Sequence, residues 1–346
     1  MESAPQLRIA FAGAVAARLE APVRAHLDVP CDVIVDDERG IVSRLGDVDV
    51  LVTMAFTPEM AAASRRLKLV QVPGAGLDRI ERAALPAGTH LANAYGHDVG
   101  IAEYVIGAML ALTRSFGRLD ASLRRGVWES QWNPTIPPPP AWPELAGKTL
   151  GILGYGRIGQ ALARRARAFD MAVCAIRQSP ARSDRDGLAF LGGPEALDEI
   201  LRRADYLAIT LSLTEATRGL LGERELRMLR PSVMLINVAR ADILDEGALY
   251  RALAEGTIAG AALDVWYRYP TGAEPTPPRM AACRVLKATP IARSAGARSW
   301  TSITPDVTAG PSYSTTKLSS LTRRDIASLG GTCPPLPPRI RQNALL

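Results

Sequence analysis

Residues 148–163 read Lys-Thr-Leu-Gly-Ile-Leu-Gly-Tyr-Gly-Arg-Ile-Gly-Gln-Ala-Leu-Ala, and this stretch decides the fold. The apolar run Thr149–Leu153 predicts a buried strand, and the amphipathic pattern over Ile158–Phe169 predicts a helix. The turn between them carries glycines at G-x-G-x-x-G spacing, namely Gly154, Gly156 and Gly159. A strand, a glycine turn and a helix in immediate succession are typical of a domain that binds a dinucleotide.

The three glycines have separate roles in such a motif. Gly154 allows the tight turn, Gly156 lets the backbone approach a pyrophosphate, and Gly159 lets the helix pack closely on the strand. The pyrophosphate would rest on the positive N-terminus of the helix. The alternative is that these glycines serve only the turn, and the strand–turn–helix context favours dinucleotide binding over it.

Short apolar segments alternate with helical ones on both sides of this motif. The alternation predicts two α/β series with parallel sheets, joined by an extended, proline-rich connector at residues 133–143. The predicted strands are Leu7–Ala12, Asp32–Val35, Val48–Val52, Leu67–Val72, Thr89–Asn93, Thr149–Leu153, Ala172–Ile176, Tyr206–Thr210, Val233–Asn237 and Gly260–Val265. The predicted helices are Pro58–Arg66, Asp98–Arg125, Ile158–Phe169 and Glu246–Glu255.

Composition excludes several classes of protein. The chain has 346 residues, 47% apolar and 22% charged, which suits two globular domains and argues against disorder. Its longest uncharged apolar run, Tyr104–Thr113, is half of the roughly 20 residues that a membrane span needs, so we expect no membrane partner. The start lacks the pattern of a signal peptide. Four scattered cysteines without a C-x-x-C pair predict a reducing cytoplasm, no disulfide framework and no metal site.

The positive net charge of +6 does not predict nucleic-acid binding, because its distribution is uneven. Residues 276–346 hold ten of the 41 Lys and Arg side chains and only two acidic ones, Asp306 and Asp325. The remainder of the chain is slightly acidic. The basic charge therefore belongs to the C-terminal tail and forms no patch on the body.

The end of the strand Ala172–Ile176 bears on the choice of cofactor. NAD-selective sites place an acidic residue here to accept hydrogen bonds from the ribose hydroxyls, but this chain has Arg177, with Ser179, Arg182 and Arg185 close behind. A guanidinium suits a 2′-phosphate, so the sequence favours NADP over NAD. The alternative is a solvated arginine in a site indifferent to the cofactor.

Further motifs carry a family resemblance. Residues 235–249 read LINVARADILDEGAL, residues 254–265 read AEGTIAGAALDV, and residues 67–78 read LKLVQVPGAGLD. Together with the glycine turn, they resemble the D-isomer-specific 2-hydroxyacid dehydrogenase family over about residues 45–275. That family includes glyoxylate/hydroxypyruvate reductases and phosphoglycerate and formate dehydrogenases.

The resemblance implies two Rossmann-like domains with doubly wound parallel sheets, the cofactor domain being inserted into a split substrate domain. The implied boundaries are residues 1–97 for the first part of the substrate domain and 98–290 for the NAD(P)-binding domain. Residues 291–346 would return to the substrate domain and end in the basic tail. The long helix after Glu103 would serve a homodimer.

The resemblance also assigns roles to individual residues. Arg240 matches the arginine that binds the substrate carboxylate and polarises the adjacent carbonyl, a task that suits bidentate pairing. Matches to cofactor-binding positions are Gly154, Gly156, Arg157, Ile158, Gly159, Val238, Ala239 and Asp264. Matches to the substrate-side loop are Ala75 and Gly76, and the loop Met54–Phe56 would lie over the substrate pocket.

The acid–base pair departs from the family pattern. Glu274, before Pro275, matches the family glutamate, but Asp306 stands where the family has histidine, and no histidine lies beyond His97. Reduction of a 2-oxoacid needs a proton for the developing alkoxide, and a free aspartic acid is ionised at neutral pH. Asp306 could keep a proton if Glu274 lies close enough to share it.

Two functions follow from these residues. The first is an NAD(P)-dependent oxidoreductase that interconverts a small 2-oxoacid and a D-2-hydroxyacid, with Arg240, Glu274 and Asp306 as its catalytic residues. The alternative is a catalytically impaired NAD(P)-binding protein with a regulatory or scaffolding role, which the missing histidine favours. Residues 280–346 are either a divergent domain end or the product of a shifted reading frame.

Overall fold

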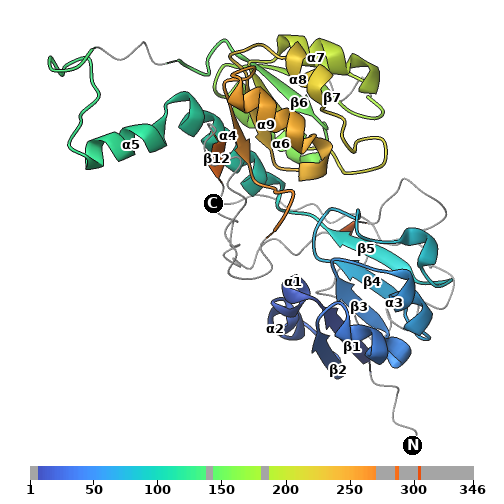
Figure 1. Ribbon diagram of the computed structural model, residues 1–346. Helices are drawn as coiled ribbons and strands as arrows, with labels where there is room; N and C mark the ends of the chain where they lie inside the picture. The colour runs from blue at the N-terminus through green and yellow to red at the C-terminus, as the bar shows by residue number, and fades with distance from the viewer. Residues whose placement is uncertain (1–6, 138–142, 181–186, 270–284, 288–302, 305–346) are drawn as a thin grey trace, which may run out of the picture. The chain divides into compact units, whose positions relative to one another are not determined.

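The computed structural model of the chain describes residues 7–137, 143–180, 187–269, 285–287 and 303–304 (Figure 1). These residues form two compact units. The first comprises the described residues up to Gly96 together with strand β13, and the second comprises the described residues from His97 onward to strand β12. The domain boundary expected after residue 97 stays a prediction, and the one expected after residue 290 lies outside the described residues.

The first unit is built on a six-stranded sheet in the order β13-β5-β4-β3-β1-β2. Its strands pair in parallel, except that β13 is antiparallel to β5. The order reverses between β1 and β3, as in doubly wound folds that start a new helix layer at this point. The strands are β1 (Leu7–Ala12), β2 (Cys31–Asp36), β3 (Val50–Thr53), β4 (Leu69–Val72), β5 (His90–Ala94) and β13 (Ile303–Thr304). The helices are α1 (Ala14–Ala17), α2 (Glu20–Arg24) and α3 (Pro58–Ala63), with 3-10 helices at Gly40–Asp47 and Arg82–Ala84.

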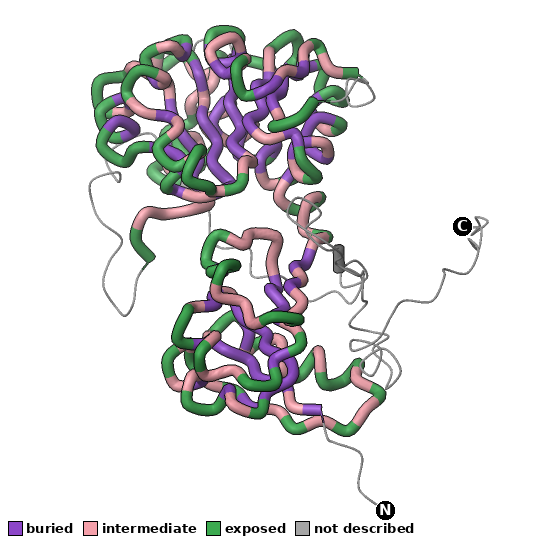
Figure 2. Tube along the Cα trace, turned by 90° about the vertical axis from the view of Figure 1, so that its right-hand side faces the viewer, coloured by how far each residue is buried: buried purple, intermediate pink, exposed green. Residues whose placement is uncertain are grey.

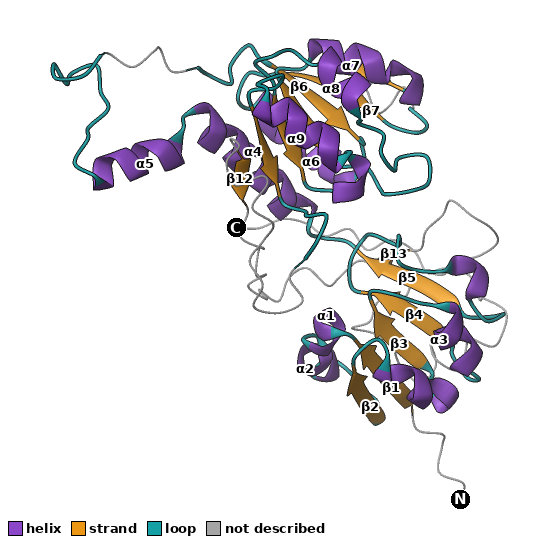
Figure 3. Ribbon diagram, viewed as in Figure 1, coloured by secondary structure: helices purple, strands orange, loops and turns teal. Residues whose placement is uncertain are grey.

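The second unit is built on a seven-stranded parallel sheet in the order β12-β11-β10-β9-β6-β7-β8. The chain winds outward from β6 in both directions, which is the order of a dinucleotide-binding fold. The strands are β6 (Thr149–Leu153), β7 (Ala172–Ile176), β8 (Phe190–Gly192), β9 (Tyr206–Ile209), β10 (Met234–Asn237), β11 (Gly260–Leu263) and β12 (Val285–Lys287). The helices are α4 (Asp98–Thr113), α5 (Phe116–Arg124), α6 (Arg157–Arg167), α7 (Leu197–Arg203), α8 (Glu223–Met228) and α9 (Glu246–Ala254), with 3-10 helices at Pro194–Ala196 and Ala241–Ile243. The predicted fold class, α/β with doubly wound sheets, is confirmed (Figure 3).

Each unit buries its central strands beneath its helices (Figure 2). Strands β3, β6 and β9 are buried on both faces, which explains why they are continuous apolar runs. Close packing at Gly151 shows how tightly helix and sheet meet. A Cβ at this position would lie 2.8 Å from Ile200 on α7, so any larger residue would push that helix off the strand.

The single helix predicted over Asp98–Arg125 is wrong. Helix α4 ends at Thr113 and α5 begins at Phe116, at an angle of 55°. Ser115 has a positive φ of 51°, which breaks the helical hydrogen-bond ladder. In the part of the chain that the structure describes, no single helix is long and apolar enough to cross a membrane. Only the bent pair α4–α5 passes that test, by length and composition alone.

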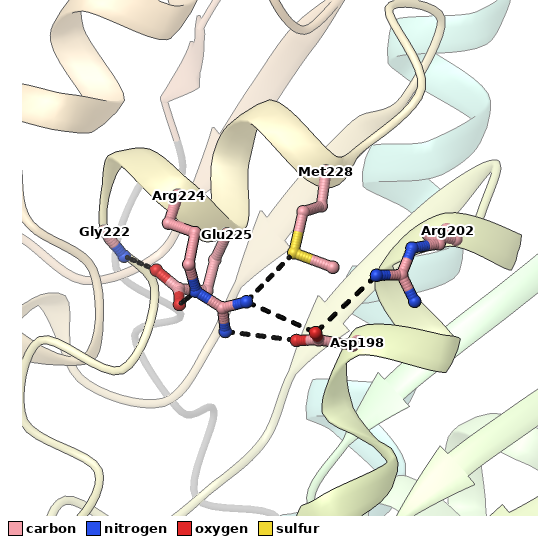
Figure 4. A network of polar contacts seen from close by, with 6 residues as sticks. All are labelled: Asp198, Arg202, Gly222, Arg224, Glu225 and Met228. Atoms are coloured by element: carbon pink, nitrogen blue, oxygen red, sulfur yellow. Dashed lines mark hydrogen bonds and ion pairs between the residues drawn. The ribbon is translucent and has the colours of Figure 1, made fainter.

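Short elements of the second unit had no sequence signal strong enough to predict them. Helices α7 and α8 are tied together by a surface network of ion pairs and hydrogen bonds (Figure 4). Arg224 on α8 donates hydrogen bonds to both carboxylate oxygens of Asp198 on α7, at 3.1 and 3.2 Å. Arg224 also bonds Glu225, whose carboxylate accepts the N–H of Gly222 at the start of α8. The network fixes two short helices that have little intrinsic stability.

Candidate functional site

The glycine turn after β6 has the geometry that the motif predicts. Gly154 has a φ of +106°, and a Cβ there would lie 2.7 Å from the backbone nitrogen of Leu211. A Cβ at Gly159 would lie 2.5 Å from the carbonyl oxygen of Gly154. Thr210, just after β9, donates its hydroxyl to that same carbonyl at 2.7 Å. Positions 154 and 159 therefore require glycine, and a neighbouring strand holds the turn in place.

Gly156 differs from the other two glycines because nothing in the protein crowds it. No heavy atom of the described chain lies within 4 Å of a Cβ built there, and the residue does not have a positive φ. It is the N-cap of α6, and no side chain caps this helix end. The backbone N–H groups of a helix's first turn can form an anion site, and the open space over Gly156 is where a pyrophosphate would approach. The site therefore fits a dinucleotide, with Arg157 and Ile158 forming the first turn of α6.

Arg177 lies beside this turn. The N–H groups of Gly154 and Tyr155 both donate to the carbonyl of Ile176, at 3.1 and 2.8 Å, and Arg177 is the next residue. Its own N–H donates to Gly192 on β8 at 3.1 Å. These backbone bonds place Arg177 at the carboxyl end of β7, next to the phosphate-binding turn.

Arg240 projects from a loop after β10 that is held by a buried side chain. Asn237 is fully buried, accepts the N–H of Ala239 at 3.0 Å and donates its amide to the carbonyl of Arg240 at 2.9 Å. The Arg240 guanidinium donates to the carbonyl of Ala239 at 2.8 Å. Val238 donates its N–H to Ile209 on β9 at 3.3 Å, which continues the ladder at this edge. Asn237 is a positioning residue whose role the sequence interpretation missed.

Asp264 follows β11 at the same edge of the sheet. Its backbone N–H donates to the carbonyl of Asn237 at 3.0 Å. Burial raises the pKa of its carboxyl above the ordinary 3.8. The second unit thus gathers most of the predicted site residues at the carboxyl ends of neighbouring parallel strands, where ligands of doubly wound sheets bind. They are Gly154, Gly156, Arg157, Ile158, Gly159, Arg177, Val238, Ala239, Arg240 and Asp264.

The first unit carries the predicted substrate-side loop. Ala75 and Gly76 follow β4, and Asn93 on β5 donates its amide to the carbonyl of Ala75 at 2.9 Å. Asn93 is 2% exposed and thereby anchors the loop from the neighbouring strand. The expectation that Met54–Phe56 lies over a substrate pocket is wrong for Phe56, which is 1% exposed and belongs to the apolar core of this unit.

The predicted acid–base pair, Glu274 and Asp306, lies outside the described residues. Two further positioning residues went unrecognised in the sequence, Thr210 and Asn93. Each is a polar residue at the carboxyl end of a buried strand, and that pattern is a signal that could have found them. Among the described residues, no group of three or more His, Cys, Asp and Glu side chains could hold a metal ion.

Two doubly wound sheets, one of them carrying an open glycine turn, define a dinucleotide-binding protein of the Rossmann type. Residues 106–289 match the sequence profile of the D-isomer specific 2-hydroxyacid dehydrogenase, NAD binding domain. The chain belongs to this family of NAD(P)-dependent oxidoreductases, as its motifs predicted.

Individual relatives agree with this assignment. The chain is 33% identical over 266 residues to a glyoxylate reductase of Thermofilum pendens, covering 72% of this chain and 74% of that protein. It is 34% identical over 238 residues to a D-3-phosphoglycerate dehydrogenase of Methanocaldococcus jannaschii, covering 66% of this chain but 43% of that protein. The chain thus spans less than half of that relative. A solved 2-hydroxyacid dehydrogenase of Ketogulonicigenium vulgare superposes with a TM-score of 0.68 at 28% identity, covering 83% of this chain and 88% of that one.

Proposed function

We propose that the protein interconverts a small 2-oxoacid and a D-2-hydroxyacid by hydride transfer with NAD(P). The observation that carries this proposal is the arrangement at the carboxyl edge of the second sheet. There, an uncrowded Gly156 at the start of α6 and Arg240 on a loop clamped by Asn237 follow strands of one sheet. The similarity to glyoxylate reductases suggests glyoxylate or hydroxypyruvate as the first substrates to test.

Arg240 is proposed to bind the substrate carboxylate. Its planar guanidinium matches two carboxylate oxygens, and its remaining donors can polarise the neighbouring carbonyl. The Asn237 clamp supports this role, because it fixes the backbone from which Arg240 extends before any substrate arrives. When bound, the reduced nicotinamide supplies the hydride; the protein supplies orientation and charge stabilisation at the carbonyl oxygen.

NADP is proposed as the preferred cofactor. The support is Arg177, which follows β7 where an acidic residue would bind the ribose hydroxyls of NAD. The residue before it, Ile176, accepts the backbone N–H groups of Gly154 and Tyr155 in the phosphate-binding turn. Replacing Arg177 with aspartate should reverse the preference. Equal affinities of the unaltered protein for NADPH and NADH would contradict it.

The proton donor is proposed from the sequence alone, as Asp306 sharing a proton with Glu274. The alternative function, a cofactor-binding protein with lost catalysis, is favoured by the same substitution of aspartate for histidine. Both candidate functions predict cofactor binding, but only the first predicts turnover.

Assembly and location complete the proposal. We propose a homodimer formed through α5 and the segment after it, which expose large apolar side chains. Four scattered cysteines suit a reducing cytoplasm, where we place the activity.

One experiment separates the two candidate functions. Purified full-length protein is mixed with NADPH or NADH and with glyoxylate or hydroxypyruvate, and the absorbance of the reduced nicotinamide is followed from pH 5 to pH 8. Turnover that rises toward acid pH supports a protonated carboxyl as the acid, and Asp306→Asn should then abolish it. Binding of NADPH without turnover would favour the catalytically impaired protein.

A further inference from the structure

The loop that carries Arg240 is held at both of its ends. Asn237 fixes its beginning, and the loop ends in a 3-10 turn, Ala241–Ile243, that leads into Leu244. Tyr267, in the segment after β11, donates its hydroxyl to the carbonyl of Leu244 at 3.0 Å. The loop after β10 is therefore tied to the segment that follows the neighbouring parallel strand.

Tyr267 is suited to be a fixed anchor. Its ring is partly buried and packs on the apolar cluster that includes Ile243 and Leu244. Burial, followed by the nearby carboxylates of Glu246 and Asp245, raises the pKa of its hydroxyl, so the group keeps its proton at neutral pH and stays a donor. One side chain thus combines apolar packing against the turn with a directed hydrogen bond to it.

Backbone hydrogen bonds connect this anchor with Arg240. The N–H of Leu244 donates to the carbonyl of Ala241 at 2.9 Å, and the N–H of Ile243 donates to the carbonyl of Arg240 at 3.3 Å. The turn therefore cannot shift at Leu244 without disturbing the backbone at Arg240. A guanidinium that must meet two carboxylate oxygens loses much of its effect when it is displaced by about 1 Å.

We propose that Tyr267 is a positioning residue for the substrate. Through the Leu244 carbonyl it holds the Arg240 loop in the orientation in which the guanidinium meets the carboxylate of a 2-oxoacid. It acts on the affinity for the substrate and leaves the affinity for the cofactor unchanged. The inference rests on the proposed function, because it requires that Arg240 binds a carboxylate. It extends that function by making the segment after β11 part of the substrate-binding machinery.

The test compares Tyr267→Phe with a matched variant, Tyr206→Phe. The Tyr206 hydroxyl also has a buried partner, the Thr113 hydroxyl at 2.7 Å, but Tyr206 lies at the start of β9, at the opposite edge of the sheet from Arg240. Full-length proteins are titrated by fluorescence with NADPH and then, with NADPH bound, with oxamate, a 2-oxoacid mimic that accepts no hydride. Melting temperatures are measured without ligands.

We expect Tyr267→Phe to bind oxamate about 3- to 10-fold more weakly, the effect expected for one hydrogen bond, and to keep its affinity for NADPH. Tyr206→Phe should keep both affinities. Both variants should melt at a lower temperature than the unaltered protein, since each loses one hydrogen bond within the fold. In an Arg240→Lys background, which cannot make the bidentate pair, Tyr267→Phe should change the affinity for oxamate by less than about twofold.

The failures can be told apart. If the unaltered protein with NADPH bound does not bind oxamate, the proposed function is wrong and this inference falls with it. If the unaltered protein binds oxamate and Tyr267→Phe binds it equally well, the inference alone is overturned. Equal losses of affinity for NADPH and oxamate would assign Tyr267 to the fold instead, and so would an undiminished effect of Tyr267→Phe in the Arg240→Lys background.

Discussion

At the scale of single residues, the glycines of the turn divide into two that the fold needs and one that a ligand needs. Gly159→Ala would put a Cβ 2.5 Å from a carbonyl oxygen, so we expect a loss of stability of about 1–3 kcal/mol. Gly156→Ala meets no neighbouring atom and adopts an allowed backbone, so its melting temperature should stay within about 2 °C of the unaltered protein.

The same two variants separate folding from binding. Because its Cβ occupies the approach of the pyrophosphate, Gly156→Ala should weaken NADPH binding at least about tenfold. Urea denaturation and a fluorescence titration measure the two effects. A Gly156→Ala protein that binds NADPH normally would argue against pyrophosphate binding at this turn.

Asp264 should make the stability of the protein depend on pH. Burial raises the pKa of this carboxyl above 3.8, so the folded state disfavours its charged form. The resulting cost is present at neutral pH and is relieved as pH falls through the folded pKa toward 3.8. Asp264→Asn should therefore stabilise the cofactor-free protein at pH 7 and lose this advantage near pH 4, as measured by urea denaturation.

Asp37 is the control with the opposite sign. It accepts the N–H groups of Gly40 and Arg39 at 2.7 and 2.8 Å, and these bonds lower its pKa below 3.8. Its contribution is present above the unfolded pKa and is lost as pH falls through the folded pKa. Asp37→Asn should thus destabilise at pH 7 and converge with the unaltered protein in acid. An identical pH profile for the two variants would contradict both assignments.

At the scale of elements, the loop after β10 depends on one buried amide. Asn237→Ala removes a donor and an acceptor from the backbone of Ala239 and Arg240, and we expect a loss of stability of about 2 kcal/mol. Turnover should fall by more than the loss of stability alone would cause, because the backbone that carries the Arg240 side chain is no longer held in place. Asn133→Ala, which breaks an exposed loop bond to Trp128, should change stability little and turnover not at all. Equal turnover of both variants would contradict the role of Asn237 in positioning Arg240.

The pairing of α7 with α8 should be sensitive to salt. Arg224→Leu breaks the bidentate contact with Asp198, and both groups are exposed, so ions screen the interaction. We expect a lower melting temperature in dilute buffer and a much smaller difference in 1 M NaCl. The melting temperature of Arg224→Lys should lie between those of the unaltered protein and Arg224→Leu, because lysine keeps the positive charge but cannot make the bidentate contact. A difference that persists unchanged in high salt would point to packing against Met228 instead.

The elements also show what the sequence could predict. Strands β1, β6 and β7 were predicted to the residue, because each is a short, mainly apolar run. The short α7 and α8 were not, since about two turns carry too little periodicity and tertiary contacts stabilise them. The site follows the same division. Glycine spacing identifies the turn, whereas the hydrogen-bond partners of Thr210 and Asn237 depend on neighbours that only the fold brings together.

At the scale of the whole molecule, the family assignment rests on the two doubly wound units and the motifs at their carboxyl edges. The uneven charge is unrelated to these motifs, because the acid-poor segment after residue 276 lies beyond most of them. The described part of the chain bears another whole-molecule feature, the apolar surface that α5 and its following segment leave exposed.

This surface should join two copies of the chain. Phe116 and Leu123 stand seven residues apart on α5, hence on one face of the helix, and are 54% and 61% exposed. Trp128 and Trp132 in the following segment are 55% and 76% exposed. We predict that sedimentation velocity will show a dimer for the unaltered protein and a monomer when Phe116→Glu is combined with Leu123→Glu. Phe169→Glu, at an exposed position just after the end of α6, should leave the dimer intact. Charged side chains in an apolar contact lose their hydration without gaining partners, and dissociation relieves that cost. A monomeric unaltered protein, or a double variant that still sediments as a dimer, would contradict this interface.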